Sequence, residues 1–240
     1  MLFICSATAA EPDEDHHIKL TKEVVASEDI ISQLISGEPV RYDNVTISGS
    51  LELAELQGSL SQPIKITNSI FLGPVRFAAA SFDEPLDLQG CIFRDNVNFF
   101  GCRFAGGAGF AGVTFEGQAD LRNTDFGGQA SFLSAQFSED ASFRNSQFAG
   151  DGIFLNSSFA RDVDFDFAQF QRLASFADAR FVNVSFLETQ FGGHTSFLNA
   201  KFHGNAAFAA TRFVGSVVFR EAGFLLGSTF GLSSFGGLAD

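Results

Sequence analysis

Residues 126–148, FGGQASFLSAQFSEDASFRNSQF, contain the pattern that decides the fold. Phenylalanine occurs here at 126, 132, 137, 143 and 148, so the steps between neighbours are alternately six and five residues long. The alternation extends in both directions over residues 71–235, with Leu88 and Leu121 in place of Phe. We call these 31 residues the anchors. Of the 32 Phe of the chain, only Phe3, Phe100 and Phe167 lie outside the pattern.

The position two residues before each anchor, which we call the slot, holds a small side chain almost everywhere. Slot residues include Cys91, Cys102, Thr124, Ala130, Ala141 and Ser146. The residue between slot and anchor is mostly polar, so small, polar and Phe alternate inward, outward and inward, as in a β-strand. An α-helix is excluded for residues 71–235, because anchors five and six residues apart would spread around its surface.

Residues two positions after the anchors indicate corners. Glycine occupies many of these positions in six-residue steps, as at Gly106 and Gly128, while Asn or Gly is frequent in five-residue steps, as at Asn123 and Asn145. Both residue types tolerate left-handed backbone. Four short sides and four corners give 22 residues per coil, and coils stack at roughly 4.8 Å. The step from Phe181 to Phe186 is five residues where six is expected, so we expect altered corner geometry there.

The pattern of a central Phe with a small residue two before it, as in Ala130-Ser131-Phe132 and Ala135-Gln136-Phe137, resembles the Phe-centred branch of the pentapeptide-repeat family. The resemblance covers about two-thirds of the chain. It implies an all-β fold, a right-handed quadrilateral β-helix, in which anchors stack along the middle of each side and slot residues fill the gaps beside them.

The N-terminal residues follow other rules and divide into two segments. Ile30, Ile31, Leu34 and Ile35 recur at helical spacing between Ser27, the expected N-cap, and Gly37. We expect a capping helix and linker over 27–44, which covers the apolar end of a β-helix that spans 45–240. Residues 1–26 are expected to be a signal remnant or a mobile acidic tail.

Residues 1–10, MLFICSATAA, resemble the end of a secretory signal, although the segment is short and lacks a basic start. Either the native start lies upstream or this segment is a simple tail. The first reading favours an exported or periplasmic protein over a cytoplasmic one. No run of 18 apolar residues indicates a membrane span.

The last coil has no counterpart to the N-terminal helix in this sequence. Its apolar residues Phe230, Phe235 and Leu238 are therefore expected to form an end-to-end interface. The expected partner is a second copy, which makes a homodimer through the C-terminal coil. The alternative is that the native chain continues, or docks another partner, at this end.

Few side chains suggest chemistry. Asp162, Asp164 and Asp166 begin like a calcium loop, but Phe167 stands where that loop needs Gly and Leu173 where it needs Glu. We expect the three Asp to form the outer surface of one side. Cys91 and Cys102 occupy slots and are expected to be buried free thiols. His194 and His203 lack an acidic and a nucleophilic partner at any meaningful spacing. No enzyme activity, catalytic residue, cofactor or metal is expected.

The formal net charge is −13, which argues against direct binding to nucleic acid. Residues 1–44 hold nine acidic and three basic side chains, so much of the excess lies outside the repeats. The sequence predicts a non-catalytic rod that acts as a protein-interaction or structural scaffold, with the partner unknown. The family resemblance supplies an alternative, a DNA mimic that binds a DNA-handling enzyme such as gyrase. Arginines spread over all sides, among them Arg94, Arg122 and Arg144, and would interrupt an acidic stripe.

Overall fold

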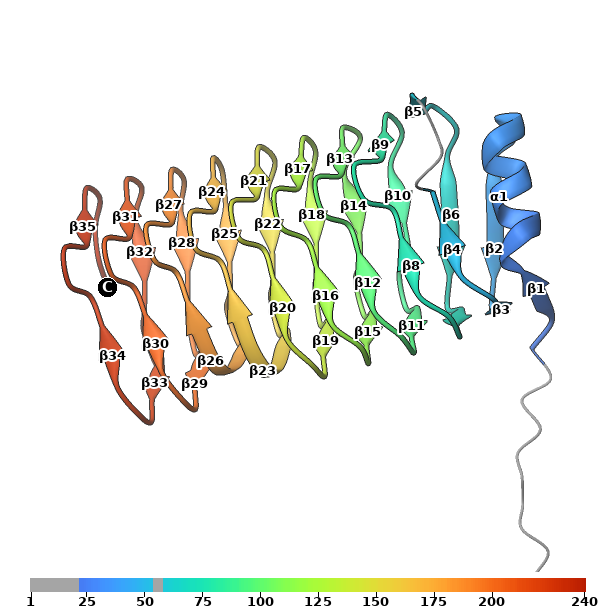
Figure 1. Ribbon diagram of the computed structural model, residues 1–240. Helices are drawn as coiled ribbons and strands as arrows, with labels where there is room; N and C mark the ends of the chain where they lie inside the picture. The colour runs from blue at the N-terminus through green and yellow to red at the C-terminus, as the bar shows by residue number, and fades with distance from the viewer. Residues whose placement is uncertain (1–21, 54–57) are drawn as a thin grey trace, which may run out of the picture.

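The computed structural model describes residues 22–53 and 58–240. In this part the chain forms a parallel β-solenoid, whose coils stack into a rod with one helix at its N-terminal end (Figure 1). The segment 1–10, with its resemblance to a secretory signal, and most of the expected signal remnant or acidic tail over 1–26 lie outside the described residues. Among the described residues, no helix reaches the length and apolarity that crossing a membrane requires.

Each coil contributes one short strand to each of four faces. The first face contains β3 (Thr46–Ser48), β7 (Ile70–Phe71), β11 (Ile92–Phe93), β15 (Thr114–Phe115), β19 (Gln136–Phe137), β29 (Lys201–Phe202) and β33 (Gly223–Phe224). The second face contains β4 (Leu51–Glu52), β8 (Val75–Arg76), β12 (Val97–Asn98), β16 (Ala119–Asp120), β20 (Ala141–Ser142), β30 (Ala206–Ala207) and β34 (Ser228–Thr229).

The third and fourth faces are nine-stranded sheets. The third contains β5 (Ser59–Leu60), β9 (Ser81–Phe82), β13 (Arg103–Phe104), β17 (Asp125–Phe126), β21 (Gln147–Phe148), β24 (Gln169–Phe170), β27 (Gln190–Phe191), β31 (Arg212–Phe213) and β35 (Ser234–Phe235). The fourth contains β2 (Val40–Asp43), β6 (Ile64–Thr67), β10 (Leu86–Asp87), β14 (Ala108–Gly109), β18 (Ala130–Ser131), β22 (Gly152–Ile153), β25 (Ala174–Ser175), β28 (Thr195–Ser196) and β32 (Val217–Val218).

The anchors point into the rod and stack on the anchors of the coils above and below. All anchors from Phe71 to Phe213 are buried. Phe154, for example, lies between Phe132 and Phe176, with ring centroids 4.8 and 5.0 Å apart and planes within 8° of parallel. The slot residues beside these anchors are buried, apart from the half-buried Ala80, whereas the residues between slot and anchor face outward. The predicted inward, outward and inward alternation is confirmed.

The two kinds of corner work differently, which corrects one prediction. In five-residue steps the residue two after the anchor has a positive φ, as at Asn123 (57°) and Asn145 (58°). The glycines at the same position in six-residue steps, such as Gly128, do not have one. A Cβ on Gly128 would lie 2.7 Å from the backbone nitrogen of Gly107 in the coil below. Glycine is needed there for close approach of two backbones, and not for left-handed conformation.

The short step from Phe181 to Phe186 joins two faces locally. Strands β23 (Ser158–Asp164) and β26 (Arg180–Ser185) run continuously around the corner between the first and second faces. Paired residues are 22 apart at Phe159 and Phe181, but 21 apart at Asp162 and Asn183. The expected change in corner geometry is therefore present, and the solenoid continues through it.

The N-terminal helix α1 (Ser27–Ser36) packs against the first coils and ends at Gly37, which has a φ of 76°. Ile30 and Leu34 are buried and line a small interior space together with Ile64 and Phe71. The prediction of Ser27 as N-cap is wrong by one residue. Ala26 holds the cap position, and Ser27 is buried as the first helical residue, where its hydroxyl donates to the Glu28 carboxylate over 3.3 Å.

Strands also occur before the expected boundary at residue 45. β1 (Val24–Ala26) pairs with β3, and β2 pairs with β6 over four residues. The segment after the helix, expected to be a linker, thus already contributes a strand to the fourth face. Hydrogen bonding to the following coil, which the sequence pattern does not display, draws these residues into the solenoid.

Candidate interaction surface

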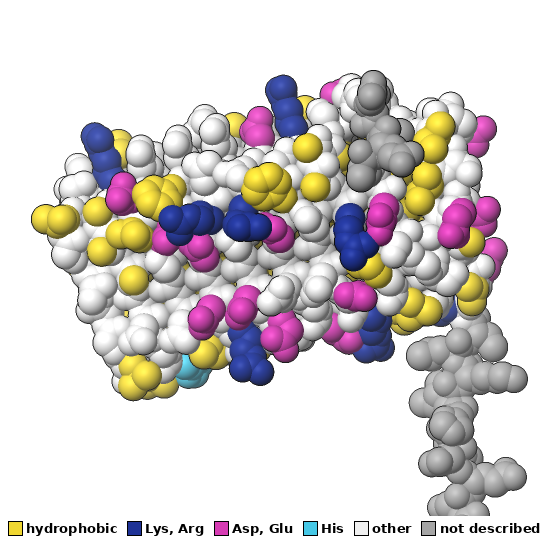
Figure 2. Space-filling model, in the orientation of Figure 1, with side chains coloured by type: hydrophobic (Ala, Val, Ile, Leu, Met, Phe, Trp, Pro, Cys, Tyr) yellow, Lys and Arg dark blue, Asp and Glu magenta, His cyan; other side chains and the backbone are white. Residues whose placement is uncertain are grey.

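A shallow groove of about 730 Å³ runs along the second face. Its side chains come from successive coils and form columns parallel to the rod. One column has Gln118, Asp140, Asp162, Asn183 and Asn205, and the next has Asp120, Ser142, Asp164, Ser185 and Ala207. Figure 2 shows acidic and basic side chains interspersed on the surface seen there, and not a continuous acidic stripe.

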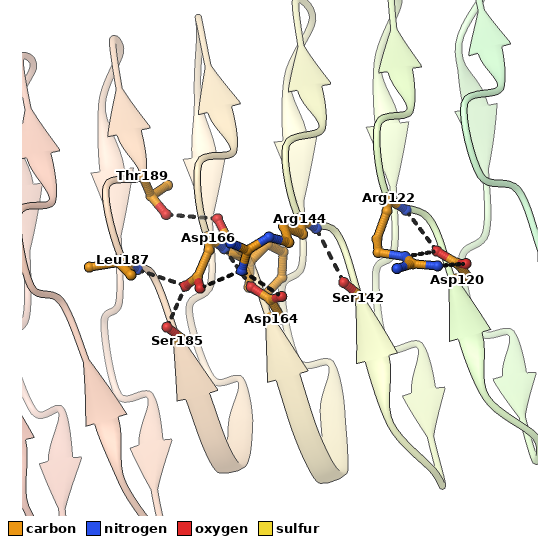
Figure 3. A network of polar contacts seen from close by, with 10 residues as sticks. Asp120, Arg122, Ser142, Arg144, Asp164, Asp166, Ser185, Leu187 and Thr189 are labelled. Atoms are coloured by element: carbon orange, nitrogen blue, oxygen red, sulfur yellow. Dashed lines mark hydrogen bonds and ion pairs between the residues drawn. The ribbon is translucent and has the colours of Figure 1, made fainter.

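Two arginines border this groove, each held by carboxylates of its own chain (Figure 3). Arg122 Nε and Nη2 donate to the two oxygens of Asp120 over 2.8 and 2.7 Å. One coil further on, Arg144 Nη1 donates to Asp166 Oδ2 over 2.9 Å and lies 3.5 Å from Asp164 Oδ2. These contacts fix the orientation of both guanidinium groups.

Asp166 is the most enclosed carboxylate of the network. Its side chain accepts hydrogen bonds from the Ser185 hydroxyl, the Leu187 amide and Arg144. Burial raises the pKa of neighbouring Asp164, and the nearby Asp166 charge adds to that rise. The Asp166 amide and Arg144 act in the opposite direction. Hydrogen bonds and partial burial thus hold the charged side chains of this network in fixed positions, unlike isolated charges in solvent.

The structure corrects the prediction that Asp162, Asp164 and Asp166 share one outer surface. Asp162 is exposed, Asp164 is half-buried and Asp166 is buried at the corner, because the backbone turns after Phe165. Each of them accepts at least one hydrogen bond from the protein, as in the 2.8 Å bond from the side-chain amide of Asn183 to Asp162. Among the described residues, no group of three His, Cys, Asp or Glu side chains converges as a metal site.

The corner between the second and third faces carries the two off-pattern phenylalanines of the repeats. The Arg122 guanidinium carbon lies 5.5 Å from the centroid of the Phe100 ring, and that of Arg144 lies 4.7 Å from the centroid of Phe167. Sequence reasoning noted both Phe and both Arg but did not bring them together. Their spacing in the sequence could have predicted this contact. Phe100, Arg122 and Arg144 follow one another at intervals of 22 residues, which is one coil, so they lie on one another along the rod.

The remaining candidate residues stay separate from this surface. The Cys91 and Cys102 thiols are buried and free, as predicted, and burial raises the pKa of each to about 12. They donate to the carbonyl oxygens of Ile66 and Phe77. His194 Nδ1 lies 2.7 Å from the Ser216 hydroxyl, and His203 is exposed. The structure does not bring the two cysteines or the two histidines to one site.

The predicted end-to-end interface residues lie at the last coil. Phe230 stacks on Phe208 at 4.7 Å and is partly buried. Phe235 is 45% exposed and Leu238 84% exposed, and Leu232 beside them is also exposed. No charged residue occurs between Glu221 and Asp240. These side chains form one apolar patch at this end of the described rod, where Asp240 is paired with Arg220.

A comparison with sequence profiles of known families agrees with this architecture. A sequence profile described as pentapeptide repeats (9 copies) matches residues 66–114, 110–158 and 154–201. No curated protein sequence matches the chain. Among solved structures, the chain is similar to HetL of the cyanobacterium Nostoc sp. strain PCC 7120, described as a pentapeptide repeat protein involved in heterocyst differentiation regulation. The identity is 13% over 86% of this chain and 93% of that chain, with a TM-score of 0.23. The profile match, over more than half of the chain and over the same coils that the structure shows, places this protein in the pentapeptide-repeat family.

Proposed function

We propose that this protein is a non-catalytic rod that acts as a protein-interaction scaffold. The observation that carries the proposal is the closed interior. Stacked anchors fill the rod, and the space lined by Ile30, Leu34 and Phe71 near the helix amounts to only about 10 Å³. A small-molecule site is ordinarily a concave pocket of several hundred cubic ångströms that buries most of its ligand. The larger hollows here are open grooves on the outside.

The outer surface suits binding to another macromolecule. Outward side chains are repeated at the spacing of the coils. Their backbone is paired with the coils on both sides, as for Ser142, which lies between Asp120 and Asp164 in the second face. Groups held in place before association lose little conformational freedom on binding. A rigid array of this kind favours recognition of a partner by shape and by the pattern of polar groups.

The DNA-mimic alternative requires a continuous acidic face. The groove of the second face does contain Asp120, Asp140, Asp162 and Asp164. Arg122 and Arg144 lie in the same groove and pair with Asp120 and Asp164, two of these four carboxylates. A supercoiling assay with DNA gyrase is the test of this alternative. Inhibition that disappears with added salt would favour the mimic over the scaffold.

The scaffold proposal is tested by affinity capture with the whole rod as bait in a lysate of its own organism. The heat-unfolded protein serves as the matched control bait. We expect one or a few proteins to be retained by the folded rod alone, in fixed proportion to the bait. Equal retention by both baits, or turnover of a substrate by the purified rod, would contradict the proposal.

The apolar patch of the last coil supports a second, narrower proposal, a homodimer formed through the C-terminal coil. A chain of net charge −13 repels its own copies, but residues 222–239 carry no charge and expose Leu232 and Leu238. We expect a dimer by sedimentation equilibrium, and Phe230→Asp should convert it to a monomer. A monomer at high concentration that keeps the last coil protected from hydrogen exchange would refute the dimer. If the native chain continues beyond Asp240, the additional residues would cover the apolar end in place of a second copy.

A further inference from the structure

Phe100 and Phe167 are not needed by the fold, yet they lie on the same corner of the rod, three coils apart. At the position of Phe100, other coils hold residues such as Ala78, Leu187 and Ala209. At the position of Phe167, other coils hold residues such as Asn123, Asn145 and Ala210. Phe100 is 39% exposed, and Phe167 has a φ of 60°, which is unfavourable for a bulky side chain. Exposed aromatic area and backbone strain both lower stability, so their presence calls for a role outside the fold.

The two rings flank two arginines that retain unused donors. An arginine has five N–H donors. Arg122 uses Nε and Nη2 for Asp120, and Arg144 uses Nη1 for Asp164 and Asp166. Among the described residues, Arg122 Nη1 and Arg144 Nε and Nη2 have no acceptor. Each guanidinium is thus oriented by a ring and by a carboxylate and keeps N–H groups for a ligand.

These side chains line an open hollow of about 360 Å³ at the corner, the corner pocket. Its lining consists of Phe100, Arg122, Asn123, Arg144, Asn145 and Phe167, with no carboxylate among them. The Asn145 amide nitrogen donates to the Asn123 amide oxygen over 2.6 Å. This leaves the Asn123 nitrogen and the Asn145 oxygen, one donor and one acceptor, as partners for a peptide backbone.

We propose that this corner docks an extended segment of a partner protein in which an acidic side chain stands beside an apolar one. The carboxylate accepts hydrogen bonds from Arg122 and Arg144, the apolar side chain packs on the exposed ring of Phe100, and the two asparagines bind the backbone. Arginine and aromatic residues are the types enriched at the energetic centres of protein interfaces. This inference rests on the proposed scaffold function and names the chemistry of its partner.

Charge complementarity selects a carboxylate over a basic group. The corner pocket presents two cationic groups, whereas Asp120 and Asp164 lie on the side of the groove and Asp166 is buried at the corner. These carboxylates offset the positive charge of the two arginines, so the long-range attraction between this corner and an acidic partner is weak. Affinity then depends on short hydrogen bonds and ring contacts, and we expect only modest sensitivity to salt.

The test uses the full chain and an array of immobilised octapeptides with all residues varied at the four central positions. We expect enrichment of sequences with Asp or Glu next to an apolar residue. The double variant Arg122→Ala/Arg144→Ala should weaken this binding roughly tenfold or more. Phe100→Ala/Phe167→Asn, which restores residues typical of these columns, should weaken it as well while it leaves the fold intact. The matched control Arg94→Ala/Arg212→Ala makes the same change in charge elsewhere on the rod and should bind like the wild type.

Several outcomes would overturn this inference. They are enrichment of basic peptides, no enrichment of acidic and apolar pairs, equal loss in the control variant, or displacement by inorganic phosphate alone as complete as by the selected peptide. The last result would indicate an anion site without peptide recognition. Affinity capture separates the two proposals. If the rod retains a partner and the corner variants retain the same amount, the scaffold function is supported and the proposed docking surface is refuted.

Discussion

At the scale of single residues, the slot hydroxyls show how the rod satisfies buried polar groups. Thr124, Ser146, Thr189 and Thr211 lie in slots of the third face, and each donates to a carbonyl oxygen of the coil below, over 2.6 to 3.0 Å. Thr195 occupies a slot of the fourth face, and its buried hydroxyl has no hydrogen-bond partner in the part of the chain that the structure describes. Valine already fills the same slot one coil later, at Val217.

We therefore expect Thr195→Val to raise the stability of the protein by about 1 kcal/mol, because an unsatisfied polar group is replaced by an apolar one of the same shape. Thr189→Val is the matched control. It removes a 2.8 Å hydrogen bond to the Phe165 carbonyl oxygen and should lower stability by about 1 kcal/mol or more. Urea denaturation followed by circular dichroism measures both. Shifts of the same sign would contradict this account of the slots.

The same scale separates anchors from phenylalanines outside the pattern. Phe154 is fully buried between two parallel rings, so Phe154→Ala should cost about 3–5 kcal/mol. Phe167 is only partly buried, and its ring contact with Arg144 contributes about 1 kcal/mol at most. We expect a large fall in melting temperature for the first variant and a small change for Phe167→Ala. A greater loss for Phe167 would mean that the assignment of anchors is wrong.

At the scale of elements, the corners determine how closely coils approach. Five-residue corners close with a hydrogen bond from the amide three residues after an anchor to the anchor's carbonyl, as between Ser146 and Phe143 over 3.1 Å. The residue before that amide, Asn145, has the positive φ expected of such a turn. Several six-residue corners instead place a glycine, such as Gly128, against the backbone of the coil below. Steric space, and not dihedral preference, therefore limits substitution at those glycines.

We expect Gly128→Ala to destabilise the rod by roughly 1–3 kcal/mol, because its Cβ would lie 2.7 Å from a backbone nitrogen and the coils must separate locally. Gly109→Ala is the control in the neighbouring coil. A Cβ there meets its nearest atom, an Asp87 carboxylate oxygen, at 3.4 Å, an ordinary contact. Thermal denaturation of the two variants should show a fall in the first and little change in the second. Similar melting temperatures would refute the steric explanation.

At the scale of the whole molecule, burial is uneven along the rod. Anchors are buried up to Phe213, partly buried at Phe219, Phe224 and Phe230, and 45% exposed at Phe235. Helix α1 covers the other end through Ile30 and Leu34. A repeat protein is stabilised mainly by contacts between neighbouring coils, and the last described coil has a neighbour on one side only.

Hydrogen exchange should therefore reveal a gradient. Amides of β16 and β20 in the middle of the rod are expected to be the most protected, and those of β35 the least, when the protein is monomeric and dilute. Mass spectrometry of peptic fragments over increasing exchange times provides the measurement. Uniform protection along the rod at low concentration would show that the solenoid opens as one cooperative unit and would contradict the gradient.

The sequence by itself determined the coil length, the inward and outward residues, the buried thiols Cys91 and Cys102, and the presence of a capping helix. These features follow from residues close together in the chain, because the alternation of six- and five-residue steps, the small slot and the turn residues each act within one side of a coil. The end of helix α1 at Gly37 belongs to the same class.

Only the tertiary structure decided the features that depend on residues about 22 positions apart. It placed Asp166 in a buried network with Arg144 and Ser185, gave the glycines of the longer corners their steric role, and drew β2 into the fourth face. It also brought Phe100 and Phe167 to one corner beside Arg122 and Arg144. A pattern read along one coil does not show which side chains stack on it, because that neighbourhood exists only once the coils lie on one another.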